Sequence, residues 1–205
     1  MTGLVLMENA GRGCADVLCR LGCQAKVVIV CGSGNNAGDG FVIARHLELR
    51  GAQVQVVLLG DPSALRGDAA SNFAILQKCE IPVLELAGNF DPNALMRALA
   101  GAQWLVDALL GTGASGPPRS PWDTVIQMLN DHPARRLAID LPTGLDCDTG
   151  VPSPTTVRAD CTCTFVAPKR GFANPLATPY LGAVEVIDIG VPKKLLSEYS
   201  GPRAT

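Results

Sequence analysis

The feature that most constrains this chain is residues 27–47, VVIVCGSGNNAGDGFVIARHL. Residues 27–31 are apolar and mostly β-branched, which is the composition of a strand buried on both faces. The next nine residues contain four glycines and the polar side chains of Asn35, Asn36 and Asp39. From Phe41 onward, apolar residues recur at helical spacing. This order predicts a glycine loop that holds a ligand at the free N–H groups of a helix N-terminus.

The glycine loop also fits a loose dinucleotide-binding pattern. Gly32, Gly34 and Ala37 match G-x-G-x-x-A, and Asp61 follows the next predicted strand, where a ribose-binding acid would lie. An ordinary strand-to-helix turn without a ligand could have the same glycines. The paired amides after Gly34 favour a ligand, because glycine alone suffices for a tight turn. An NAD-dependent oxidoreductase is therefore one open alternative.

Size and charge restrict the kinds of partner. At 205 residues the chain is expected to form a single domain, residues 1–205, with a full core. Its formal charge is −2, from 17 Lys and Arg against 19 Asp and Glu, and it has no basic run. These values give no electrostatic support to nucleic-acid or anionic-membrane binding. A small molecule is the expected partner.

The cysteines and apolar segments indicate the cellular compartment in which the chain is expected to reside. Eight cysteines occur without C-x-x-C pairs and with only two histidines, so neither a zinc site nor a disulfide framework is predicted. A reducing, cytoplasmic setting is expected. No apolar run approaches the roughly 20 residues needed to cross a bilayer, so no membrane span is expected.

Predicted strands and helices alternate along the chain, which indicates an α/β fold with three αβα layers, Rossmann-like, around a mostly parallel central sheet. Strands are expected at 27–31, 53–59, 82–86, 103–110, 135–141, 159–166 and 183–189. Helices are expected at about 5–21, 41–49, 67–79, 92–100 and 121–130.

Two later strands end in an acid followed by a glycine-rich or proline-containing turn. Asp107 precedes the loop at 111–117, and Asp140 precedes Pro142-Thr143-Gly144. With the strand order 3-2-1-4-5, the loops after strands 1, 4 and 5 share one crevice at the carboxyl edge of the sheet. Three unusual polar loops meeting there predict a binding site.

Other polar residues have simpler structural interpretations. Glu8 is expected to complement the dipole of the first helix. Asp146 and Asp148 suggest a metal, but Asx-turns are favoured because a full calcium loop is absent. Lys169 could contact a phosphate or simply be solvated.

The chain resembles the YjeF N-terminal domain, the NAD(P)H-hydrate epimerase family. The resemblance is carried by LMENAG, GSGNNAGDGFVIARHL, DALLGTGASG, LAIDLPTGLDCDTG, ADCTCTFVAPKRG and VIDIGVP, and it covers nearly the whole chain. It implies interconversion of the R and S epimers of hydrated NADH and NADPH. No kinase-like dehydratase domain follows, so a separate dehydratase is the expected functional partner. Relatives usually have a further helix ahead of LMENAG, which leaves a homodimer open.

The resemblance also implies site residues. One potassium ion per subunit is expected on Asn36, Asp107 and Thr143, whose carboxylate, amide and hydroxyl oxygens suit a monovalent ion better than magnesium. Asp140 is expected to be the catalytic acid, partly desolvated between apolar neighbours and able to protonate the departing hydroxyl. The implied substrate-binding residues are Asn35, Asn36, Ala37, Gly38, Asp39, Gly111, Thr112, Gly113, Ala114, Ser115, Gly116, Pro117 and Asp140. A non-catalytic nucleotide-binding or scaffold module of the same fold is the second alternative.

Overall fold

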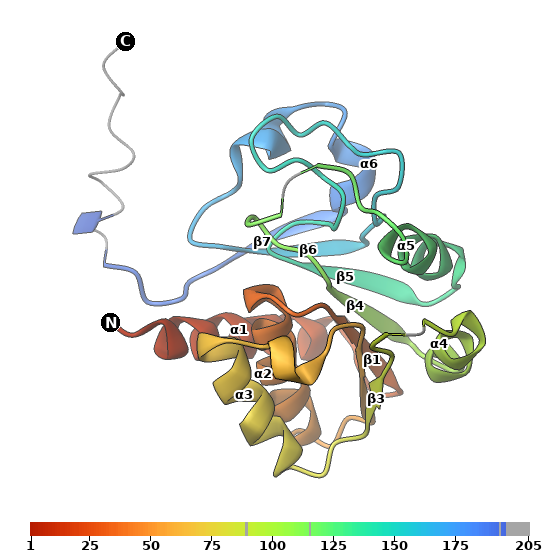
Figure 1. The fold of residues 1–205 in the computed structure, drawn as a ribbon. Coiled ribbons are helices and arrows are strands. Elements are labelled where there is room, and N and C mark those ends of the chain that lie inside the picture. The colour runs from red at the N-terminus through yellow and green to blue at the C-terminus, as the bar shows by residue number, and fades with distance from the viewer. Residues whose placement is uncertain (89, 115, 193, 196–205) are drawn as a thin grey trace.

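The computed structural model describes residues 1–88, 90–114, 116–192 and 194–195 (Figure 1). Its centre is a seven-stranded sheet in the order β3-β2-β1-β4-β5-β6-β7, and every pairing is parallel. The strands are β1 (Val27–Cys31), β2 (Val54–Leu58), β3 (Val83–Glu85), β4 (Trp104–Ala108), β5 (Arg135–Ile139), β6 (Cys161–Phe165) and β7 (Ala183–Ile187). The α/β class and the order of the first five strands are confirmed.

Helices cover both faces of the sheet and complete three layers (Figure 1). One face carries α1 (Gly3–Leu21), α2 (Asn35–Glu48) and α3 (Gly67–Gln77). The other face carries α4 (Pro92–Leu99) and α5 (Trp122–Asp131). Three short helices, η1 (Pro62–Ala64), η2 (Arg170–Ala173) and α6 (Thr178–Leu181), lie in the connections.

The central strand β1 is buried at all five positions, and its side chains alternate between two cores. Val27, Ile29 and Cys31 belong to the core under α1, α2 and α3. Val28 and Val30 belong to the core under α4 and α5. A parallel strand covered by helices on both faces has no solvent side, which explains why its sequence is apolar without interruption.

The start of α2 differs from the expectation. This helix begins at Asn35 rather than near Phe41, so most of the predicted glycine loop forms its first turns. Gly34 has an extended backbone, with φ −94° and ψ −168°, and precedes the helix. Position 38 lies within the helix and is a glycine because a Cβ there would come 2.5 Å from the Sδ atom of Met7. That glycine therefore serves the close packing of α2 on α1, which local propensity cannot reveal.

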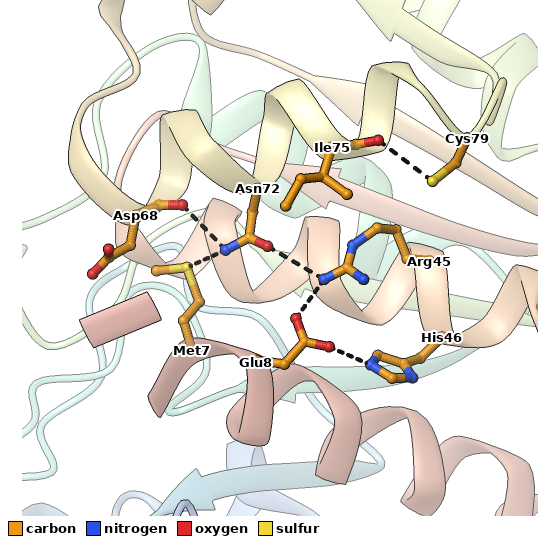
Figure 2. A network of polar contacts seen from close by, with 8 residues as sticks. All are labelled: Met7, Glu8, Arg45, His46, Asp68, Asn72, Ile75 and Cys79. Carbon is orange, nitrogen blue, oxygen red and sulfur yellow. Dashed lines mark hydrogen bonds and ion pairs between the residues drawn. The ribbon is translucent and has the colours of Figure 1, made fainter. Parts of the chain in front are cut away.

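A polar network joins α1, α2 and α3 (Figure 2). The Glu8 carboxylate accepts a hydrogen bond from Arg45 at 2.5 Å and lies 2.7 Å from Nε2 of His46. Arg45 also donates to the Oδ1 atom of Asn72 at 3.3 Å. Burial acts to raise the pKa of Glu8, but the bonds from His46 and Arg45 outweigh it and lower that pKa. The dipole interpretation of Glu8 was wrong, because its carboxylate connects α1 to α2.

None of the described helices is long and apolar enough to cross a membrane. All eight cysteines are free thiols, as the sequence analysis expected. Cys14 on α1 and Cys161 and Cys163 on β6 are buried in the same core. These thiols are part of the packing between α1 and the sheet.

Candidate active site

The carboxyl ends of β1 and β4 form the topological switch point of the sheet. The two strands are neighbours, but the chain leaves β1 through α2 on one face and β4 through α5 on the other. A crevice opens where the connections diverge in this way. Gly32 lies at this point, where its N–H donates to the carbonyl oxygen of Ala108 at 3.0 Å and a Cβ would clash with the carbonyl oxygen of Leu109. Gly32 thus permits two strand ends to approach.

A cavity of about 410 Å³ occupies this crevice. It is lined by three segments far apart in the sequence: the start of α2, the loop after β4 and the residue after β5. The lining residues are Ser33, Gly34, Asn35, Asn36, Asp39, Leu109, Leu110, Gly111, Thr112, Gly113, Ala114, Trp122, Asp140 and Phe165. The predicted convergence of three loops is therefore observed.

Some of the predicted substrate-binding residues lie elsewhere. Ala37 is packed in the core under α1, α2 and α3, and Gly38 faces Met7 of α1. Gly116 and Pro117 line a second cavity, of about 230 Å³, that shares the residues 110–112 and 114 with the first. Ser115 lies outside the described residues.

The N-terminus of α2 presents polar groups to the larger cavity. No described side chain caps this helix end; the N–H of Ala37 donates to the carbonyl oxygen of Gly34, which leaves the N–H groups of Asn35 and Asn36 available to a ligand anion. The Asn36 side chain is buried, and its Nδ2 atom has no hydrogen-bond partner among the described residues. An unsatisfied buried amide is costly in a folded protein. Both observations indicate that this helix end is suited to contact a group outside the described residues.

Asp140 follows β5 in a strained conformation. Its φ is 67°, in the left-handed region that residues other than glycine rarely adopt. Its carboxylate lies 2.5 Å from Nζ of Lys169 and 3.5 Å from the hydroxyl of Thr164. The residue is 8% exposed. Apolar neighbours alone were predicted for Asp140, and a phosphate or solvent for Lys169, whereas the structure pairs this lysine with Asp140.

Asp39 is a second carboxyl on the same cavity. It lies in the second turn of α2 and is 8% exposed. Burial, and then the charge of Asp140, raise the pKa of Asp39 well above its ordinary value. Two carboxyls with different surroundings on one cavity are a common arrangement for acid–base chemistry.

A third acid, Asp107, lies at the end of β4 and is bound to Thr143. The Thr143 N–H donates to Oδ2 of Asp107 at 2.8 Å, and its hydroxyl donates to Oδ1 at 2.7 Å. The N–H of Leu109 also donates to Oδ1, at 3.2 Å. Burial raises the pKa of Asp107 to about 6 despite these bonds. The pair connects the loop after β4 to the loop after β5.

The residues expected to hold potassium have a suitable chemistry. Asp107 supplies one buried carboxylate and Thr143 a hydroxyl, while the amide of Asn36 can present its oxygen by rotating about its last bond. One negative charge with neutral oxygen donors suits a monovalent ion. The described residues contain no group of three or more His, Cys, Asp or Glu that could hold a metal ion, so a transition-metal site has no basis there.

Two other motifs are explained by local turns. The Asp146 carboxylate accepts hydrogen bonds from the N–H groups of Asp148 and Thr149, so the Asx-turn interpretation is confirmed. These bonds, from Thr149 first, lower the pKa of Asp146. Asp61 accepts from the N–H of Ser63 at the start of η1 and does not line the cavity. The acid of the dinucleotide-binding pattern is therefore used as a helix cap.

Sequence reasoning missed three residues at the site. Trp122 and Phe165 line the cavity, and Lys169 pairs with Asp140. The only signal for Lys169 was a basic residue in the turn after β6. Since β6 is the neighbour of β5, a cation in that turn can reach the acid that ends β5. The neighbour relation of the two strands was needed to make this connection.

Comparisons with known proteins place the chain in a family. A model of the protein family described as "YjeF-related protein N-terminus" matches residues 3–171. The chain is 50% identical to the NAD(P)H-hydrate epimerase of Pirellula staleyi, over 97% of this chain and 87% of that protein. It is 43% identical to the NAD(P)H-hydrate epimerase of Rhodopirellula baltica, over 98% and 80%.

Longer relatives and a solved structure are also similar. The bifunctional NAD(P)H-hydrate repair enzyme Nnr of Moorella thermoacetica is 40% identical over 95% of this chain, which corresponds to 37% of that enzyme. The crystal structure of yeast YNL200c superposes with a TM-score of 0.82 at 23% identity, covering 100% of this chain and 87% of the yeast chain. The latter similarity shows a shared fold.

Proposed function

The chain belongs to the family of YjeF-related protein N-termini, and on that premise we propose that it is an NAD(P)H-hydrate epimerase, an isomerase that interconverts the R and S epimers of hydrated NADH and NADPH. One observation carries the proposal: the start of α2, the loop after β4 and Asp140 line a single cavity at the switch point of the sheet. A pocket of about 410 Å³ can enclose the reacting half of a dinucleotide.

The cavity offers the groups that such a substrate needs. The free N–H groups at the start of α2 are suited to a phosphate of the nucleotide. Asn35 and Asn36 supply amide groups, and residues 111–114 also line the cavity. Gly116 and Pro117, which line the smaller cavity, are further nucleotide contacts that the family resemblance implies.

Epimerisation at C6 of the hydrated ring requires the C–O bond to weaken on one face and to form again on the other. Asp140 is the proposed acid–base residue, because it lines the cavity and its carboxylate is held by Lys169. A strained backbone at a residue of this kind is a frequent feature of active sites.

Potassium is the proposed ion, held by Asn36, Asp107 and Thr143. When bound, it would offset the buried charge of Asp107 and steady the loops after β4 and β5. The support for it is the unpartnered Asn36 amide and the burial of the Asp107 carboxyl.

The bifunctional repair enzyme of Moorella thermoacetica, of which this chain matches 37%, supports a dehydratase as the functional partner of the epimerase. Eight free thiols support a reducing, cytoplasmic setting. A homodimer stays a prediction, which light scattering of the purified protein tests.

The test is a time course of purified R-enriched NADPH hydrate, followed by chromatography or NMR in potassium buffer. Wild type is expected to interconvert R and S, and Asp140→Asn is expected to lose roughly 10²–10⁴-fold in rate. Glu48→Gln, an exposed position at the end of the same α2 helix, is the matched control and should retain the wild-type rate.

One result would contradict the proposed function, and another only the role of Asp140. A wild-type protein that binds the hydrate without interconverting its epimers would favour a non-catalytic binding module. Full turnover by Asp140→Asn would remove Asp140 from the chemistry and leave the epimerase assignment in place.

A further inference from the structure

Two buried carboxyls, Asp39 and Asp140, line the larger cavity, and one ammonium lies beside them. Lys169 lies 2.5 Å from Asp140, so the charge of Asp140 is compensated. None of the residues that line the cavity is a lysine, arginine or histidine. No hydrogen-bond donor among the described residues reaches the Asp39 carboxyl. Asp39 is thus equally buried but has no compensating partner in the described chain.

The elements packed around α2 do not change this charge balance. Their titratable groups near the start of α2 are acids, thiols and one exposed arginine: Glu8, Arg12 and Cys14 on α1, Asp68 on α3, Cys31 on β1, Asp107 on β4 and Asp140 after β5. Glu8 is engaged by Arg45 and His46 farther along α2. Asp140 is the only one of these groups whose charge appreciably changes the pKa of Asp39, and its carboxylate has the same sign of charge.

A buried carboxylate without a cation or a hydrogen-bond donor is unstable relative to the neutral acid. The surroundings of the two acids therefore differ. The Asp140 carboxylate is paired with the Lys169 ammonium, whereas burial, and then the charge of Asp140, raise the pKa of Asp39 and favour its protonated form. Pairs of titratable groups whose surroundings drive them to opposite states often divide the acid and base roles of a reaction.

We propose that Asp39 is a second catalytic residue, the general acid that protonates the departing hydroxyl, while Asp140 acts as the base for the incoming water. This assignment rests on the proposed function and divides its chemistry between two carboxyls. Nucleotide binding alone would not require Asp39 to carry a proton.

The proton of the Asp39 carboxyl moves to the hydroxyl oxygen on C6, and the C6–O bond breaks with its electron pair leaving as water. The lone pair of N1 forms a C6=N1 double bond, which gives a ring cation and an Asp39 carboxylate. Water then adds to C6 from the other face, and one of its protons passes to Asp140. Exchange of protons with solvent restores the starting pair.

Asp39→Asn is the decisive variant, because the amide matches the neutral acid in shape and charge but donates no proton to a leaving group. Epimerisation is expected to fall roughly 10²–10⁴-fold. The Kd for NADP, used as an unreactive nucleotide, is expected to change by less than about threefold. If Asp39 instead bound substrate as an anion, removal of its charge would change that Kd while leaving the bound substrate reactive. Glu48→Gln is again the matched control on α2.

A second measurement does not depend on activity. Infrared spectroscopy of the ligand-free protein at neutral pH should show the carbonyl stretch of a protonated carboxylic acid. Asp39→Asn should remove that band, and Glu48→Gln should retain it. Absence of the band in wild type, or its persistence in Asp39→Asn, overturns the proposal.

The results separate the two levels of inference. A wild type that epimerises while Asp39→Asn does so equally fast overturns the role of Asp39 alone. A wild type that does not epimerise overturns the proposed function, and with it any catalytic role for Asp39.

Discussion

Nζ of Lys169 lies 2.5 Å from the carboxylate of Asp140. Asp140 follows β5 and Lys169 follows β6, and these neighbouring strands end in turns of the same kind. Asp140 has φ 67° and Val166 has φ 71°. Each turn is closed by a hydrogen bond across it, 2.8 Å long, from the next N–H to the preceding carbonyl oxygen. Positive φ is unfavourable for aspartate and more so for a β-branched residue. Strain at two adjacent strand ends therefore accompanies the ion pair at the cavity.

Replacing Lys169 tests that pair. Lys169→Met leaves the buried Asp140 carboxylate without its cation, and loss of one partner of a buried pair typically costs about 3–5 kcal/mol. We expect a large fall in the free energy of unfolding, measured with urea, and a loss of epimerisation of at least about 100-fold. Lys169→Arg retains the charge and should recover part of both. Lys78→Met, at an exposed lysine, is the control; stability and turnover equal to this control would contradict the role of the pair.

Asp107 should make stability depend on pH. Its pKa is about 6 in the folded protein, above the ordinary value of 3.8, so the folded state binds this proton more tightly than the unfolded chain. The free energy of unfolding should therefore fall as pH rises from about 4 to about 6 and then level off. One pKa unit corresponds to about 1.36 kcal/mol, so the total is on the order of 3 kcal/mol.

Urea unfolding across that range in potassium-free buffer checks the prediction. Asp39, whose pKa is also raised, contributes with the same sign. Asp107→Asn should therefore reduce the pH dependence without abolishing it. Superimposable pH profiles for wild type and Asp107→Asn would show that the Asp107 carboxyl titrates normally.

Potassium should stabilise the protein if it binds at Asn36, Asp107 and Thr143. At ten times its Kd, a ligand specific for the folded state adds about 1.4 kcal/mol, which is roughly a 3–6 °C rise in Tm for a chain of this size. Thermal melts in potassium chloride and in choline chloride of equal ionic strength measure the difference. Thr143→Val lacks the hydroxyl and should lose the response, while Thr143→Ser should retain it. Equal Tm values in both salts for wild type would argue against the site.

The Glu8 contacts should stabilise the packing of α1 on α2 (Figure 2). The Glu8 side chain is 40% exposed, so solvent screening limits its contribution, and Glu8→Gln should lower the free energy of unfolding by about 1 kcal/mol at neutral pH. Because the folded pKa of Glu8 is lowered, this loss should diminish as pH falls below its ordinary value of 4.5.

The pair of Asp16 with Arg50 supplies the matched control for Glu8. It also connects α1 to the end of α2, but the Asp16 side chain is 60% exposed. Asp16→Asn should change the free energy of unfolding by less than about 0.5 kcal/mol. Equal losses in the free energy of unfolding for Glu8→Gln and Asp16→Asn would mean that the burial of Arg45 does not strengthen the Glu8 contacts.

Much of the fold could be read from local patterns. Apolar runs, helical spacing and the placement of glycine and proline predicted all seven strands and the five long helices, with boundaries a few residues longer than observed for most. The exception was the start of α2. There Gly38 lies inside the helix for the sake of contact with Met7, so the local rule that glycine marks a loop gave a wrong boundary.

The candidate site was predicted in part. Unusual polar loops after three strands, combined with the expected strand order, placed Asn36, Asp39 and Asp140 in one crevice, and all three line one cavity. The family resemblance also implied Ala37 and Gly38, which face the core and α1. Helical periodicity explains the difference, since successive residues of α2 point in different directions.

The sequence alone thus determined the order of strands and helices and the edge of the sheet at which ligand-binding groups gather, because these depend on residues close together in the chain. The tertiary structure alone decided which charges meet. The pairing of Asp140 with Lys169, and the absence of a partner for Asp39 among the described residues, follow from strand order, backbone turns and burial. Electrostatic interactions act through space over a few ångströms, and in a low-dielectric interior the nearest opposite charge fixes the state of an acid.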